Sequence, residues 1–104
     1  MDLKTTGKFR KDYKRCKKRG LDMRPLKEVI SNLLSGKPLE EKYRDHGLVG
    51  QYAGHRECHI LPDWLLIYYV DNESLILTAV RTETHSDLLE SQPPLQVVVW
   101  NNAP

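Results

Sequence analysis

Side chains that can donate or accept protons lie near the ends of apolar segments in the second half of the chain. His46 lies in a polar stretch, His59 and Asp63 flank a Leu-Pro pair, and Arg81 and His85 follow the last apolar segment. These residue types suit the cleavage of RNA, in which the ribose 2′-OH loses a proton and attacks the adjacent phosphate while the 5′ oxygen leaves. Histidine can act as base or acid because its ordinary pKa is about 6.5, and arginine binds phosphate through paired hydrogen bonds. We therefore expect these five residues to be catalytic.

Each candidate also has a simpler interpretation. A histidine in a loop is usually only a solvated polar residue, and Asp63 is an ordinary turn residue. Arg81 has Glu83 and Glu57 available as ion-pair partners. Trp64 opens an apolar segment, so it is more often a core residue than a platform on which an RNA base stacks. The candidates are informative only if the fold brings them together.

The first third of the chain predicts a helical hairpin. Thr6 is a suitable N-cap for a helix over residues 8–19, whose apolar positions are spaced by four and three, and Gly20 is suited to end it. Asp22 is the N-cap candidate of a second helix, which continues to Leu34 at helical spacing.

The rest of the chain predicts strands. Residues 2–5 form a short first strand, residues 50–60 alternate with Glu57 and His59 on one face, and residues 64–70 form a central strand. A turn over 71–74 leads to a strand from Leu75 to Val80, after which Thr84 can cap a short helix through Leu89.

These elements predict an α+β fold, in which an N-terminal helical hairpin packs on a small antiparallel sheet and a short C-terminal helix follows. In such a meander the end of the His59 strand lies beside the start of the Trp64 strand. The last strand then brings Arg81 near Trp64. We therefore expect His59, Asp63, Trp64, Arg81 and His85 to meet at one edge of the sheet.

The charge is strongly segregated. Residues 1–27 hold eleven Lys and Arg against three Asp, a local net charge of +8, whereas the remaining residues carry a net charge of −6. The basic helix is either a solvated surface or a binding surface for phosphates or an acidic partner. Lys11, Lys14 and Lys18 are the candidate substrate-binding lysines on it.

The composition bounds the remaining possibilities. The 104 residues fit one domain, which we place at residues 1–90, followed by a tail at 91–104 of uncertain origin. Cys16 and Cys58 match no paired-cysteine motif, so they are interpreted as reduced residues, with a disulfide as the alternative. No apolar run is long enough to span a membrane, so we expect a soluble cytoplasmic protein. No cofactor is expected.

Three segments of the chain together resemble the YafQ branch of the RelE/ParE toxin superfamily. They are RDHGLVG at 44–50, GHRECHILPDWLLIY at 54–68 and RTETH at 81–85, in this order and at fitting separations. The resemblance covers about residues 1–90. It implies a RelE-like fold and a ribosome-dependent mRNA interferase that is paired with an inhibitory antitoxin.

The resemblance also implies roles for individual residues. His85 would protonate the leaving 5′ oxygen, and His46 or His59 would take the proton of the 2′-OH. Arg81 would stabilise the charge on the phosphate, and Asp63 would orient a histidine. Two further residues would contact or shape the site. They are Trp64 and Leu89, the latter standing where the family commonly has an aromatic residue.

Three other functions are compatible with parts of this pattern. A gyrase-inhibiting toxin of the ParE type would share the fold but would need no histidine cluster. A metal-dependent hydrolase would use His46, His59, Asp63 and His85, yet no compact metal-ligand motif such as HExxH is present. A non-catalytic module would bind nucleic acid through the basic helix alone.

Overall fold

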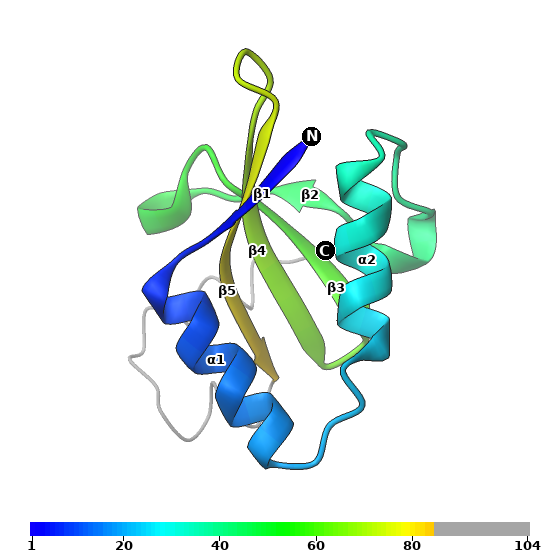
Figure 1. Cartoon of the computed structure of the whole chain (residues 1–104). Helices are drawn as coiled ribbons and strands as arrows, with labels where there is room; N and C mark the ends of the chain where they lie inside the picture. The colour runs from blue at the N-terminus through cyan, green and yellow to red at the C-terminus, as the bar shows by residue number, and fades with distance from the viewer. Residues whose placement is uncertain (85–104) are drawn as a thin grey trace.

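The structure is a computed structural model, and it describes residues 1–84. Two helices and five strands make up most of this region (Figure 1). In chain order the elements are β1 (Asp2–Thr5), α1 (Gly7–Lys18), α2 (Arg24–Leu34), η1 (Glu41–Tyr43), β2 (His46–Gly47), η2 (Gly50–Tyr52), β3 (Arg56–Leu61), β4 (Trp64–Asp71) and β5 (Ile76–Thr84). Both helices cover the same face of the sheet, which gives the expected α+β fold.

Local signals set the helix ends. The Thr6 hydroxyl accepts the N–H of Phe9 at 3.0 Å, a cap that contributes about 1 kcal/mol, and Gly20 leaves α1 with a φ of 85°. Helix α2 begins one residue later than expected, because its N-cap is Met23 and not Asp22. Asp22 still accepts the N–H of Arg24 at 3.0 Å. Both predicted helices are therefore confirmed, and in the structure α1 packs on β5 while α2 packs on β3.

The sheet has the strand order β1-β5-β4-β3-β2. The neighbours from β2 to β5 are antiparallel, but β1 pairs in parallel with β5, so the sheet is mixed and not wholly antiparallel as predicted. The reason is that β1 continues into α1 and not into a hairpin. A strand that reaches its neighbour through a helical crossover is free to lie parallel to it.

Two strand boundaries differ from the prediction. Strand β3 begins only at Arg56, because Gly50 and Gly54 take φ values of 77° and 85° and fold the preceding residues into a turn. Strand β5 continues to Thr84, with a bulge where Ile67 pairs with Arg81 but Tyr68 pairs with Ala79. Arg81 is therefore inside a strand and lies opposite Ile67, not beside Trp64. The predicted short helix through Leu89 lies outside the described residues.

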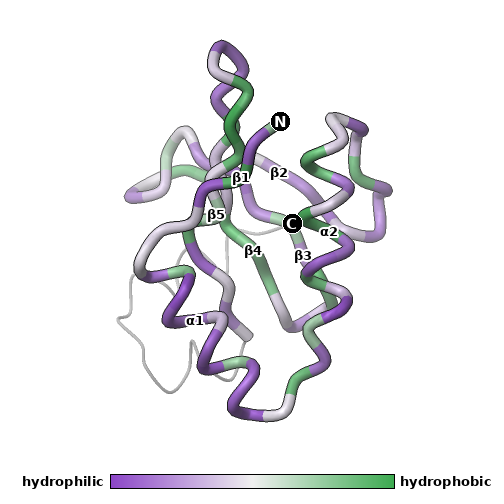
Figure 2. The backbone as a smooth tube through the Cα atoms, viewed as in Figure 1, coloured by the Kyte–Doolittle hydropathy of each residue, from purple (hydrophilic) through white to green (hydrophobic). Residues whose placement is uncertain are grey.

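The main hydrophobic core lies between the helices and the sheet. Leu26 of α2, Cys58 of β3, Leu66 of β4 and Leu77 of β5 are completely buried there. Figure 2 shows β4 as a largely hydrophobic stretch at the centre of the sheet. A smaller cluster on the opposite face contains Leu48, Leu65 and Ile67.

Two expectations about composition can be compared with the structure. Cys16 and Cys58 are both buried, and neither forms a disulfide, in agreement with the reduced interpretation. Within residues 1–84 neither helix is long and apolar enough to cross a membrane.

Candidate active site

The sheet face without helices, which we call the open face, carries three of the five predicted catalytic residues. Although no helix covers this face, most of its side chains are buried. Because Cys58 and Leu66 point into the helical core, the alternating residues of β3 and β4 point the other way. Cross-strand pairing then sets two rows on this open face. One row contains His46, Glu57, Ile67 and Arg81, and the other contains His59, Leu65 and Glu83.

Glu57 lies between two histidines. Its Oε1 is 3.4 Å from Nε2 of His46 and 3.8 Å from Nε2 of His59. The Glu57 side chain is only 1% exposed, and those of His46 and His59 are 16% and 9% exposed. We call these three residues the histidine–glutamate cluster. The two imidazole rings are 6.3 Å apart, so both can act on one scissile linkage.

Backbone carbonyls orient both histidines. Nδ1 of His46 lies 2.6 Å from the carbonyl oxygen of Arg44, and Nδ1 of His59 lies 3.3 Å from that of Pro62. A carbonyl oxygen only accepts hydrogen bonds, so each Nδ1 is assigned the proton. Each Nε2 therefore turns a lone pair toward Glu57 whenever its ring is neutral.

Burial shifts the proton affinities within the histidine–glutamate cluster. Desolvation raises the pKa of Glu57 from 4.5 to about 7. Desolvation also lowers the pKa of His59, and the charge of His46 acts in the same direction, while the hydrogen bond to Pro62 opposes them. The raised pKa of Glu57 and the lowered pKa of His59 both favour a proton on Glu57 over one on His59. Shifted proton affinities of this kind are typical of sites for general acid–base chemistry.

A second carboxylate fixes the segment that carries His46. Asp45 accepts the hydroxyl of Tyr68 at 2.5 Å and the Nε of Arg56 at 3.3 Å. Burial and the bond to Asp45 raise the pKa of Tyr68, so its hydroxyl stays protonated and donates. We call these three residues the Asp45 bracket. The bracket ties the short strand β2 to β3 and β4.

Arg81 does not extend freely from the sheet. Its Nε and Nη2 donate to the buried carboxylate of Asp12 on α1, at 2.7 and 3.1 Å. Its Nη2 also contacts Glu83 Oε1, so the alternative ion pair with Glu83 is present. The Nε and Nη2 edge of the guanidinium is thus occupied by carboxylates, and the role of Arg81 at the phosphate stays a prediction.

Asp63 and Trp64 are neighbours in the chain but lie in different surroundings. Asp63 is exposed in the turn between β3 and β4 and makes no hydrogen bond to a histidine among residues 1–84. Trp64 is only 1% exposed, and its Nε1 donates to the hydroxyl of Thr82 at 2.9 Å. The burial of Trp64 favours the core interpretation over a platform on which RNA stacks. Its place in the core allows it to support the site from the helical side.

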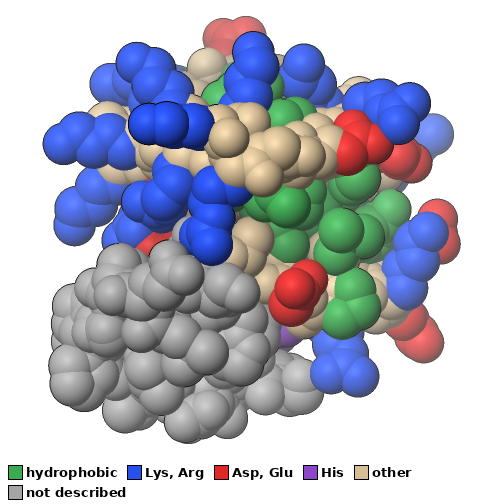
Figure 3. All heavy atoms as spheres, turned by 90° about the horizontal axis from the view of Figure 1, so that it is seen from below, with side chains coloured by type: hydrophobic (Ala, Val, Ile, Leu, Met, Phe, Trp, Pro, Cys, Tyr) green, Lys and Arg blue, Asp and Glu red, His purple; other side chains and the backbone are tan. Residues whose placement is uncertain are grey.

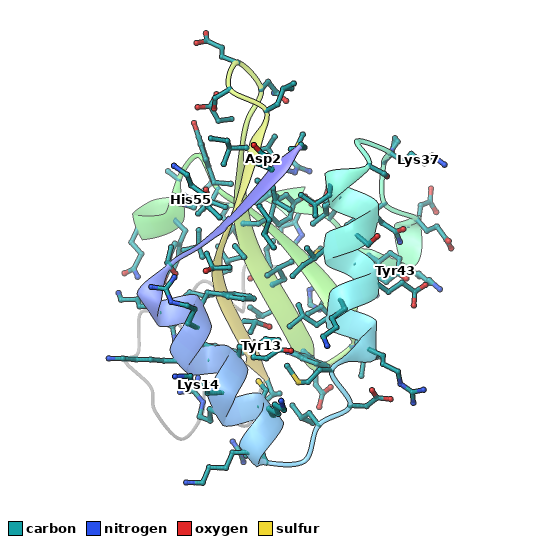
Figure 4. All side chains as sticks on the ribbon, in the orientation of Figure 1. Asp2, Tyr13, Lys14, Lys37, Tyr43 and His55 are labelled. Atoms are coloured by element: carbon teal, nitrogen blue, oxygen red, sulfur yellow. The ribbon has the colours of Figure 1, made fainter. Side chains whose placement is uncertain are left out.

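The remaining candidates lie elsewhere. Lys11, Lys14 and Lys18 are exposed on α1, and Figure 3 shows Lys and Arg side chains gathered over this side of the molecule. Figure 4 shows Lys14 on α1 and His55 near η2, both on the left of the view, with Tyr43 on the right. His85 and Leu89 lie outside the described residues.

Comparison with known proteins identifies the family. The model of a family described as "Bacterial toxin of type II toxin-antitoxin system, YafQ" matches residues 1–90. The chain belongs to the YafQ toxin family. The resemblance predicted from the three sequence segments is confirmed.

Individual YafQ relatives agree closely in sequence and fold. The mRNA interferase toxin YafQ of Escherichia coli K12 is 39% identical over 88 residues, which cover 84% of this chain and 94% of that protein. In the E. coli DinJ-YafQ toxin-antitoxin complex, the matched chain is 39% identical with a TM-score of 0.74, covering 84% of this chain and 94% of that one. A metal-bound toxin from Helicobacter pylori is 41% identical with a TM-score of 0.77, covering 85% and 98%.

The sequence did not single out three acidic residues that contact the predicted site residues or their neighbours. They are Glu57, Asp45 and Asp12. For Glu57 a signal was present, because strand alternation already placed it on the face of His59. For Asp12 the only signal was a lone carboxylate within a basic helix. Among residues 1–84 no group of three or more His, Cys, Asp or Glu is arranged to hold a metal ion.

Proposed function

We propose that this chain is the toxin of a type II toxin–antitoxin pair and that it is an endoribonuclease cutting mRNA on the ribosome. The observation that carries the proposal is the histidine–glutamate cluster. Two oriented imidazoles share one buried carboxyl group on the open face of the sheet. Three buried or half-buried titratable side chains this close together are typical of a site for proton transfer.

In the proposed reaction, Nε2 of His46 or His59 takes the proton of the ribose 2′-OH. The 2′ oxygen then bonds to phosphorus, the bond from phosphorus to the 5′ oxygen breaks, and a 2′,3′-cyclic phosphate remains. Glu57 stabilises the imidazolium that forms, because its carboxylate lies within 3.4–3.8 Å of both nitrogens. His85 gives a proton to the leaving 5′ oxygen, and Arg81 offsets charge on the phosphate.

Two kinds of partner follow from this proposal. The exposed lysines of α1 would contact ribosomal RNA phosphates, which supply much of the affinity of such complexes. A cognate antitoxin would inhibit the toxin, as expected for this family. The E. coli YafQ is found in a toxin–antitoxin complex with DinJ.

The direct test maps the 5′ ends of cellular mRNA after the chain is expressed, for messages that do and do not bind ribosomes. We expect new ends in ribosome-bound messages only. His46→Ala and His59→Ala should each lower the cleavage rate by about 10²–10⁴-fold, and His85→Ala should relieve growth arrest. His55→Ala is the matched control, because His55 lies outside the cluster and should leave cleavage unchanged. Full cleavage by both cluster variants, or cleavage lost only in EDTA with intact ribosomes, would contradict the mechanism.

A further inference from the structure

Asp12 is a buried carboxylate at the centre of the most basic part of the chain. It is only 2% exposed, although the residues beside it on α1 are mostly exposed lysines and arginines. A carboxylate at this depth requires several donors, since an unpaired buried charge is strongly destabilising. The hydrogen-bond donors around Asp12 therefore explain how it can be buried.

Four donors converge on Asp12. Arg81 provides Nε at 2.7 Å and Nη2 at 3.1 Å, and the backbone N–H of Thr82 lies at 3.1 Å. Arg15, one turn along α1, provides Nη2 at 2.7 Å. Asp12 thus joins α1 to the part of β5 that extends beyond the pairing with β1, which ends at Ala79. The contact spans 69 residues of sequence.

This arrangement fixes the plane of the Arg81 guanidinium. Its Nε and Nη2 edge faces Asp12, and Nη2 also contacts Glu83. The Nη1 group is the part of the guanidinium that these contacts do not occupy. An arginine held on one edge loses little conformational entropy when the other side meets an anion.

We propose that Asp12 is a positioning residue for the cleavage reaction, which holds Arg81 so that Nη1 meets the phosphate undergoing attack. This inference rests on the proposed function. Asp12 touches neither the RNA nor the reacting atoms. It acts through Arg81, and through the same contact it fixes α1, with its exposed lysines, to the strand that carries Arg81.

The test compares Asp12→Asn, Arg81→Ala and the double variant in cleavage of ribosome-bound mRNA. We expect Asp12→Asn to lower kcat by about ten- to hundred-fold with little change in KM, because a displaced guanidinium stabilises the phosphate less. In the Arg81→Ala background, Asp12→Asn should cause no further loss. Asp22→Asn is the matched control, since Asp22 forms an exposed ion pair with Arg24 and should leave kcat unchanged.

The outcomes separate this inference from simple structural damage and from the proposed function. Equal further losses in both backgrounds would show that Asp12 is only structural and would overturn the inference. If Asp12→Asn does not fold, Asp12→Glu keeps the charge. We then expect Asp12→Glu to fold and to lower kcat in the unaltered chain but not in the Arg81→Ala background. An unchanged kcat in the unaltered chain would overturn the inference. Full cleavage by Arg81→Ala would also overturn it while leaving the proposed function intact, whereas absence of mRNA cleavage by the unaltered chain would overturn both.

Discussion

Glu57 shows how one residue combines a cost in stability with a chemical use. A carboxylate that is 1% exposed loses its hydration, and this burial raises its pKa to about 7. The same burial places its oxygen between two imidazole nitrogens. Burial favours the protonated form of Glu57, and this proton lies close to both histidines. A residue whose burial costs stability can therefore still serve the chemistry of the site.

The stability of the fold should depend on pH through Glu57. Because folding raises the pKa of Glu57 from 4.5 to about 7, the stabilisation from its protonated form is present below the unfolded value and is lost as the pH rises through about 7. Glu57→Gln cannot ionise, so we expect the variant to gain stability relative to the unaltered chain between about pH 5 and pH 8, by up to about 3 kcal/mol.

Urea unfolding of both proteins at the two pH values measures this difference. His59 acts in the opposite sense, because its lowered pKa removes stabilisation as the pH falls. The difference between the two proteins is therefore the informative quantity, and not the profile of either one. Glu73→Gln, in the exposed β4–β5 turn, is the control. A free-energy difference independent of pH would refute the assignment of the raised pKa to Glu57.

Among the elements, β2 is the one whose position most needs explanation. It has two residues and only two paired positions with β3, too few to hold it by backbone hydrogen bonds alone. The Asp45 bracket supplies the missing restraint through Tyr68 of β4 and Arg56 of β3. His46 follows Asp45 directly, so the bracket also sets the distance from His46 to Glu57.

Removal of the Tyr68 hydroxyl should loosen β2 without emptying the core. Tyr68→Phe keeps the buried ring but leaves a lone pair of Asp45 unpaired, which should lower the free energy of unfolding by about 1–3 kcal/mol. Cleavage should fall as well, because His46 is less well held. Tyr69→Phe is the matched control, since the adjacent Tyr69 is 43% exposed and points to the other face. Equal effects of the two variants in urea unfolding and in cleavage would contradict the role of the bracket.

For the whole molecule, the segregation of charge supports the proposed role of α1 in binding RNA phosphates. The positive charge of residues 1–27 lies mainly on the exposed surface of α1, beside the strand that carries Arg81. Contacts between Arg81 and Asp12 keep this surface in a fixed position relative to the open face of the sheet. An RNA bound along α1 would therefore be presented to the site in one register.

The triple variant Lys11→Ala, Lys14→Ala and Lys18→Ala should weaken ribosome binding by reducing phosphate contacts. We expect the slope of log K against log salt to become shallower by about two to three. The matched control changes Lys27, Lys37 and Lys42, which are exposed on the α2 side, to alanine with the same loss of charge. Salt titrations of ribosome binding measure both slopes, and equal reductions would mean that only net charge matters.

Sequence by itself determined the local elements and the family of this protein. Thr6, Gly20 and the apolar spacing of the first 34 residues define the two helices, and strand alternation places Glu57 and His59 on one face. The motif segments around His46, His59 and Arg81 identified the YafQ family before any coordinates. These signals are local, because capping, periodicity and motifs depend on residues close in sequence.

Only the tertiary structure decided which distant residues meet. The parallel pairing of β1, the bulge beside Arg81 and the contact between Asp12 and Arg81 all depend on register between segments far apart in sequence. A bulge of one residue shifts every later residue of β5 by one position relative to β4, so Arg81 lies opposite Ile67, where the register before the bulge would have placed it opposite Leu66. The spacing of residues along the chain does not predict such shifts in strand register, since they are set by how side chains of distant segments pack together.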